Sequence, residues 1–201
     1  ANGKYPVEAV KTMVKISEDV EGRIKHDKVL SKLMMSHASS VPMAISLASV
    51  TTAYELGASA IISATVSGST AKNVSRFRPE CPILAITPSK NVARKLSVYW
   101  GVYPIVAELY ESTDEMIDST AEIAKKKGFV KDGELVVITA GLPINFVGST
   151  NMIKVHLIGD VLLQGKRTHE TKQVVSGVIK KAINFKMADE KISDGDILVV
   201  N

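Results

Sequence analysis

Short apolar runs alternate with helix signals through the middle of the chain, and this alternation restricts the possible folds more than any other feature. The runs that read as strands are residues 60–64, 82–87, 102–107, 133–140 and 151–158. Most are separated by one helix and short loops, which is the pattern of βαβ units with right-handed crossovers. The fifth follows the fourth through a long loop without a helix, so we expect it to run antiparallel at an edge. We predict an α/β fold with three layers, α/β/α, and a sheet of about five mostly parallel strands.

Capping residues mark where the intervening helices begin and end. Hydroxyl side chains suited to the N-cap position stand at Ser40, Ser89 and Ser112. The helix after Ser40 has Pro42 in its first turn and Gly57 as its stop. Its residues are apolar almost all round, which predicts a buried helix. Glu115 completes a capping box with Ser112 at the start of the last of these helices.

Composition excludes several classes of protein. Hydrophobic residues make up 45% and charged residues 23%, as in ordinary globular proteins. The formal net charge is only +4 and the basic residues are scattered, so no nucleic-acid partner is expected. The single cysteine, Cys81, excludes an internal disulfide and favours a reducing compartment. Because no apolar stretch reaches the roughly 20 residues that span a bilayer and no signal peptide is evident, we expect a soluble cytoplasmic protein with no membrane partner.

The two flanks differ from the middle, and we divide the chain into three parts. Residues 1–36 are helical and rich in charge, residues 37–158 form the α/β domain, and residues 159–201 contain strand-like pieces at 174–179 and 197–200. The last part is short and ends on an apolar strand. We interpret it as a partial, β-rich segment of a further domain, because so short a segment rarely buries enough surface alone.

A hydroxyl-rich loop follows the first predicted strand and opens a helix. It contains Thr65, Ser67, Gly68, Ser69 and Thr70. Backbone N–H groups at a helix start, together with hydroxyl donors and a glycine that allows close approach, are what a phosphate group needs. The loop lacks the Gly-Lys-Ser/Thr of a Walker motif. It indicates either a phosphate site or a plain hydroxyl-capped turn.

A second polar loop, residues 141–151, follows the fourth strand and carries Gly148, Ser149 and Thr150. Ligands of open α/β sheets bind beyond the carboxyl ends of the parallel strands, where both loops fall. The two positions therefore favour one ligand site shared by both loops over a site on either loop alone. The alternative is that residues 141–151 are an ordinary connection without a ligand. No catalytic pattern stands out, because the histidines at 26, 37, 156 and 169 lack metal-ligand spacing and one cysteine cannot build a zinc site. No metal ligands or catalytic residues are expected in this chain.

Several of these segments, taken in order, resemble one family. Residues 3–10 with Met13 resemble the end of the catalytic barrel of pyruvate kinases, and residues 62–71 resemble that family's effector-phosphate loop. Residues 77–79 with 82–87 resemble the next helix end and strand, and residues 141–155 resemble the closing loop and last strand. The tail, at 159–165, 175–177 and 195–199, is similar to the start of the extra C-terminal domain of some bacterial pyruvate kinases, which resembles the swivelling domain of phosphoenolpyruvate-using enzymes.

The resemblance implies a regulatory role without catalysis. The parent enzyme would convert phosphoenolpyruvate and ADP to pyruvate and ATP in glycolysis, with Mg²⁺ and K⁺, as a homotetramer. Its catalytic residues would lie in the barrel, before Ala1, so this chain alone should be inactive. The partners implied are a phosphorylated effector, the chain's own catalytic barrel and further copies of the subunit. Effector binding carries over to Thr65, Ser67, Gly68, Ser69 and Thr70, and more loosely to Gly148, Ser149 and Thr150.

One departure from the family pattern concerns the effector. Relatives activated by fructose 1,6-bisphosphate place an Arg early in the helix that begins near Ser112, and Met116 stands there in this sequence. Without that cation the better expectation is a monophosphate, such as AMP, ribose 5-phosphate or a hexose phosphate. Two other functions remain open at this point: an assembly module that binds no effector, and an unrelated small α/β enzyme, for which we find no nucleophile, acid or metal site.

Overall fold

The computed structural model describes residues 3–21, 23, 40–143, 150–159, 179–182, 192–193 and 197–200. The chain divides into two compact units, Ala1–Ile158 and Gly159–Asn201. The second contains a parallel pair of short strands, β6 (Ile179–Ala182) and β7 (Ile197–Val200). Of the strand expected at 174–179, only the last residue lies among the described ones. None of the helices within these ranges is both long and apolar enough to cross a membrane.

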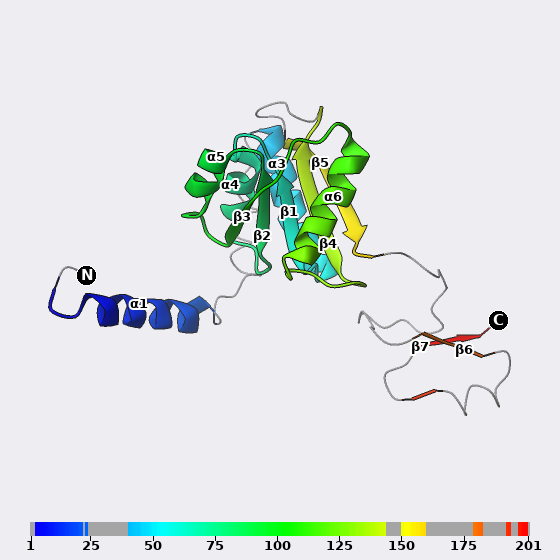
Figure 1. The fold of residues 1–201 in the computed structure, drawn as a ribbon, viewed down its shortest axis with the longest axis horizontal. Helices are drawn as coiled ribbons and strands as arrows, with labels where there is room; N and C mark the ends of the chain where they lie inside the picture. Colours follow the sequence, from blue (N-terminus) through cyan, green and yellow to red (C-terminus); the bar gives the residue numbers. More distant parts are fainter. Residues whose placement is uncertain are drawn as a thin grey trace. The chain divides into compact units, whose positions relative to one another are not determined.

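The first unit contains the α/β domain that the apolar runs predict (Figure 1). Its elements in chain order are α1 (Pro6–Glu21), α3 (Val41–Leu56), β1 (Ala60–Ala64), α4 (Ser69–Ser75), β2 (Ile83–Thr87), α5 (Lys90–Leu96), β3 (Val102–Val106), α6 (Thr113–Lys126), β4 (Leu135–Gly141) and β5 (Thr150–Leu157). The sheet order is β3-β2-β1-β4-β5. The strands pair in parallel except β4 with β5, which are antiparallel. Both the mixed sheet and the antiparallel edge are thus confirmed.

Alternate residues of the sheet face two separate cores. Ile61 of β1 packs with residues of α3, α4 and α5, whereas its neighbour Ile62 packs with residues of α6. Figure 1 shows the same three layers, with α6 on one side of the sheet and α3 and α4 on the other. Because both faces are covered, the central strands are apolar at nearly every position, as buried parallel strands require. This layering leaves the ends of the strands as the places where a ligand can enter.

Two of the three expected hydroxyl caps form hydrogen bonds. Ser89 Oγ accepts a hydrogen bond from the N–H of Val92, and Ser112 Oγ accepts one from the N–H of Glu115. The carboxylate of Glu115 accepts from the N–H of Glu111 rather than from Ser112, so the capping box is only half formed. Ser40 occupies the N-cap of α3 with extended backbone angles, but its hydroxyl makes no capping hydrogen bond.

The prediction that α3 is buried is wrong. Its buried residues lie on one side, where it packs on β4 and β5, whereas Val41, Tyr54 and Leu56 are between 43% and 63% exposed. Nothing among the described residues covers this apolar side. The uniform apolar composition of the helix therefore reflects two surfaces, of which only one belongs to the core of this domain.

Candidate functional site

A pocket lies at the carboxyl ends of the parallel strands β1, β2 and β4. This is the position at which open α/β sheets bind ligands. Water-sized groups can occupy about 40 Å³ of this pocket. A single water needs about 10–15 Å³, so the pocket has room for about three waters. The lining residues are Ala64, Thr65, Val66, Ser67, Ser69, Thr70, Ile86, Thr87, Pro88, Glu108, Leu109, Tyr110, Met116, Ala140, Gly141 and Thr150.

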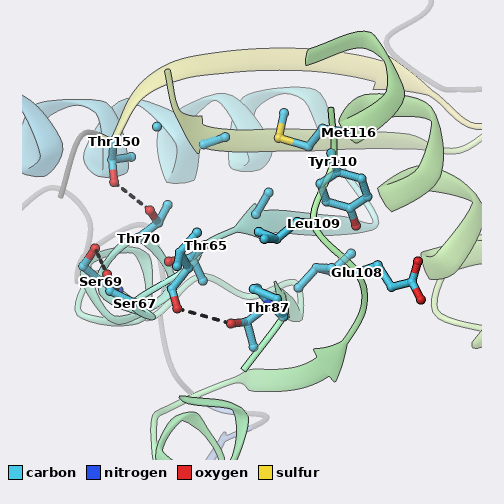
Figure 2. A pocket seen from close by; sticks show the side chains of 16 residues that line it. Thr65, Ser67, Ser69, Thr70, Thr87, Glu108, Leu109, Tyr110, Met116 and Thr150 are labelled. Carbon is cyan, nitrogen blue, oxygen red and sulfur yellow. Dashed lines mark hydrogen bonds between the residues drawn. The ribbon is translucent and has the colours of Figure 1, made fainter. Parts of the chain in front are cut away.

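The loop after β1 forms one wall, and its hydroxyl groups hold its shape (Figure 2). Thr65 Oγ1 accepts a hydrogen bond of 2.9 Å from the N–H of Gly68. Ser67 Oγ donates to Ser69 Oγ at 3.0 Å and accepts from the N–H of Ser69 at 3.4 Å. In these bonds the hydroxyl groups of Thr65 and Ser69 act as acceptors. Among the hydrogen bonds between described residues neither hydroxyl is a donor, so each has a proton to donate to an anion. Because α4 has only seven residues, hydrogen bonds from these hydroxyls would contribute more to anion binding than the dipole of the helix.

Gly68 is the N-cap of α4 and sets the turn of this loop. Its φ is +85°, in the left-handed region that glycine adopts without steric cost. It also packs closely on α5, since a Cβ at this position would lie 3.0 Å from Cγ1 of Val92. The glycine therefore serves both the turn and the contact between α4 and α5.

A buried hydrogen bond joins this loop to the edge strand. Thr70 Oγ1 and Thr150 Oγ1 lie 2.7 Å apart, and both residues are almost fully buried. Asn151 accepts a hydrogen bond from the N–H of Leu142 and donates one to its carbonyl oxygen, both at 2.7 Å. The two loops that the sequence predicts to share a site thus meet at Thr70 and Thr150. Gly148 and Ser149 lie outside the described residues.

The opposite wall is mostly apolar. Leu109, Tyr110 and Met116 face the hydroxyl loop across the pocket, and the carboxylate of Glu108 points away from that loop (Figure 2). Burial raises the pKa of the Tyr110 hydroxyl, and the carboxylate of Glu115 raises it further, so this group is a neutral phenol at physiological pH. None of the described lining residues is Lys, Arg or His.

Sequence reasoning missed several of these lining residues. Thr87 ends β2 and Pro88 follows it, and residues 108–110 follow β3. The same rule about the carboxyl ends of parallel strands, applied to every strand and not only to the first and fourth, would have indicated them.

The described residues offer no catalytic or metal cluster. No three His, Cys, Asp or Glu side chains among them come together as a metal site. His156 is half-buried on β5, and its pKa is lowered by burial and then by the charge of Lys154, against the opposing effect of Asp118. The histidines at 26, 37 and 169 lie outside the described residues. The hydrogen-bond donors that line the pocket among the described residues are neutral hydroxyl groups, and its one described carboxylate belongs to Glu108.

These features define an α/β domain with a pocket at the carboxyl ends of its parallel strands, and comparison with known proteins gives its family. Residues 43–156 match the family described as pyruvate kinase, alpha/beta domain. The chain belongs to this family. These 201 residues contain its α/β domain and not the catalytic barrel of these transferases.

Similar proteins are found across much of the chain. The chain is 48% identical over 158 residues to a pyruvate kinase of Clostridium acetobutylicum, which covers 79% of this chain and 33% of that protein. It is 41% identical over 199 residues to a pyruvate kinase of Geobacillus stearothermophilus, covering 99% and 34%. The crystal structure of a pyruvate kinase from Cryptosporidium parvum matches with a TM-score of 0.70 and 26% identity, over 79% of this chain and 31% of that one. The chain spans about a third of the length of these relatives.

Proposed function

We propose that this chain is the regulatory part of a pyruvate kinase and binds a phosphorylated small-molecule effector in the pocket described above. The observation that carries the proposal is the wall of hydroxyl groups at the carboxyl end of β1, where the hydroxyls of Thr65 and Ser69 have protons to donate. Hydrogen bonds from neutral donors to a charged phosphate contribute about 1.5–3 kcal/mol each. The effector's phosphate lies against residues 65–70 and Thr150, and the resemblance adds Gly148 and Ser149, which lie outside the described residues.

The rest of the effector is uncharged and contacts the apolar wall. Met116 is 2% exposed and lines the pocket, and it stands at the sequence position where the resemblance places an Arg in relatives activated by fructose 1,6-bisphosphate. Residues 141–151 also contain no Lys or Arg. A second phosphate would thus be desolvated without a cationic partner, which is costly. AMP, ribose 5-phosphate or a hexose monophosphate fits this arrangement better than fructose 1,6-bisphosphate.

Isothermal titration calorimetry tests this function. The chain is titrated with AMP, ribose 5-phosphate, glucose 6-phosphate and fructose 1,6-bisphosphate. We expect one monophosphate to bind and the Ser67→Ala/Ser69→Ala variant to lose at least about tenfold in affinity. Ser119→Ala is the matched control, because this serine lies on α6 and does not line the pocket. Tight binding of the bisphosphate with none of the monophosphates would contradict the proposal, as would equal affinity in both variants.

A second function, subunit assembly, is favoured by the edges of the sheet. β3 carries Pro104 within the strand, which removes a hydrogen-bond donor and blunts that edge. β5 has no proline, and its Val155 and Leu157 are 41% and 37% exposed. α3, which has exposed apolar residues near both of its ends, packs on this strand. Together they form an apolar surface suited to a second copy of the chain.

Sedimentation equilibrium tests the assembly role. We expect the chain to associate and the Val155→Glu/Leu157→Glu variant to remain a monomer. Val98→Glu is the control, because Val98 is the more exposed residue, at 85%, and lies beyond α5. A wild-type monomer at all concentrations, or a variant that associates as well as the wild type, would contradict this role.

The activity of the whole enzyme follows from the same proposal. We infer that the complete protein transfers phosphate from phosphoenolpyruvate to ADP with Mg²⁺ and K⁺ held by its barrel, and that these 201 residues contribute regulation. The expected result is no pyruvate formation by this chain under assay conditions in which a full-length relative is active.

A further inference from the structure

A second pocket opens at the amino ends of the parallel strands, at the opposite edge of the sheet from the effector site. Its volume is about 420 Å³, within the range of about 300–1,000 Å³ typical of small-molecule sites. The last turns of α3 form one side of it, residues 57–59 before β1 form the base, and residues 77–81 before β2 form the other side. The effector proposal makes no use of these residues.

The floor of this second pocket is apolar. Val50 and Ala53 from α3, Ala58 before β1 and Phe77 after α4 line it, and each is at most 7% exposed. All four belong to the core between the sheet and α3, α4 and α5. A ligand seated here would contact these four residues and also Tyr54, which is 47% exposed. Such a lining favours an aromatic or branched aliphatic body.

The charges around the pocket favour a cation. α3 has 16 residues and ends at the pocket, yet its last turn contains no basic residue and does contain Glu55. The carbonyl end of a helix carries partial negative charge, which a cation there would stabilise. Glu80 adds a full negative charge on the opposite wall. Among the described residues that line the pocket, Arg78 is the one cation, and its guanidinium lies 4.9 Å from the ring centre of Trp100, a residue outside the lining.

The environment of Cys81 agrees with this electrostatic picture. The pKa of its thiol is raised to about 11, chiefly by burial, with a backbone hydrogen bond that lowers it and the charge of Glu80 that raises it. The field of Glu80 therefore acts on a group that lines the pocket. A ligand with a negative charge would meet the same field and be repelled.

We propose that this second pocket binds a small organic monocation, with an aromatic or branched aliphatic body on the floor formed by Val50, Ala53 and Phe77 and an ammonium group between Glu80 and the carboxyl end of α3. The apolar body supplies most of the affinity, and the ammonium group sets the preference for amines. This site is separate from the effector site, so either can exist without the other.

Amide chemical shifts of the ¹⁵N-labelled chain test the proposal with three probes of similar shape. Phenethylamine is the cation, 2-phenylethanol is neutral and 3-phenylpropanoate is the anion. We expect phenethylamine to shift the amides of Ala53, Ala58 and Cys81 and not those of residues 65–70. Its dissociation constant should be about two- to fivefold lower than that of the alcohol, as a charge at a helix end predicts. The carboxylate should bind more weakly than the alcohol.

Two substitutions separate the contributions of shape and charge. Ser59→Phe places a ring in the pocket and should abolish the shifts with all three probes. Glu80→Gln removes the charge from an exposed position and should reduce the preference for the amine over the alcohol, whereas Glu122→Gln on α6 should not. The proposal is overturned if the carboxylate binds as well as the amine, if the shifts map elsewhere, or if Glu80→Gln leaves the preference unchanged.

Discussion

Substituting Gly68 by alanine should destabilise the domain and weaken effector binding together. An alanine would have to adopt a φ of +85°. The left-handed conformation costs an L-residue about 1–2 kcal/mol. Its Cβ would also stand 3.0 Å from Cγ1 of Val92 and 3.3 Å from Cδ2 of Leu96. Valine is stiff about χ1, so moving Val92 aside adds about 0.5–1.5 kcal/mol. Gly68→Ala should therefore lower the free energy of unfolding by about 1.5–3.5 kcal/mol in total.

A second glycine separates the two terms of this estimate. Gly128 has a φ of +77°, and a Cβ there would meet no heavy atom within 4 Å. Gly128→Ala should therefore lower the free energy of unfolding only by the cost of the left-handed conformation, about 1–2 kcal/mol. The difference between the two variants measures the contact between α4 and α5.

Urea unfolding followed by the fluorescence of Trp100 measures both variants. This is the sole tryptophan of the chain, and it lies between α5 and β3, so its signal reports on the α/β domain. Calorimetry with the monophosphate bound by the wild type gives the second readout, where Gly68→Ala should lose affinity and Gly128→Ala should not. The reasoning is refuted if Gly68→Ala is no less stable than Gly128→Ala.

Three further predictions follow from individual contacts. Thr150→Val leaves the buried hydroxyl of Thr70 without its 2.7 Å partner and should lower the free energy of unfolding by about 1–3 kcal/mol; adding Thr70→Val should recover part of the loss in urea unfolding. Ser112→Ala removes the cap of α6 and should cost about 1 kcal/mol, measured by the same assay. Because the folded pKa of Cys81 is about 11 against an ordinary 9.0, its alkylation at pH 8 should be about a hundredfold slower than that of a free thiol. The same raised pKa gives stability that is present below pH 9 and is lost as the pH rises through about 11.

The order and type of the elements could be predicted because both faces of the sheet are covered. Apolar runs such as residues 60–64 and 133–140 occur where a strand is buried on both sides, and the helices between them carry their own caps. The strand ends differ from prediction by a residue or two, since β4 begins at Leu135 and β5 at Thr150. Composition could not show that α3 is only half covered, because apolar residues occur both in a domain core and at exposed positions of a helix.

The candidate site could be predicted only in part. Thr65, Ser67, Ser69, Thr70 and Thr150 all line the pocket, because polar residues at the carboxyl ends of buried strands have few other roles. Leu109 and Tyr110 follow β3, so the same rule places them near this edge of the sheet, but their apolar composition gives no sign that their side chains line the pocket. Their position against the hydroxyl loop depends on how the chain turns after β3, which no local pattern specifies. The second pocket was missed because its floor consists of ordinary core residues.

The two proposed functions share one hydrogen bond, and this makes them testable as a coupled system. Thr70 belongs to the effector loop, and Thr150 begins β5, the edge strand of the proposed assembly surface. If effector binding changes the association constant, association must change effector affinity by the same factor. The monomeric Val155→Glu/Leu157→Glu variant should therefore bind the effector with altered affinity although none of its changes touches the pocket. Thr150→Val should reduce that difference, because it removes the link between the loop and the strand. Equal effector affinity in the monomer and the assembled chain would show that the two functions are independent.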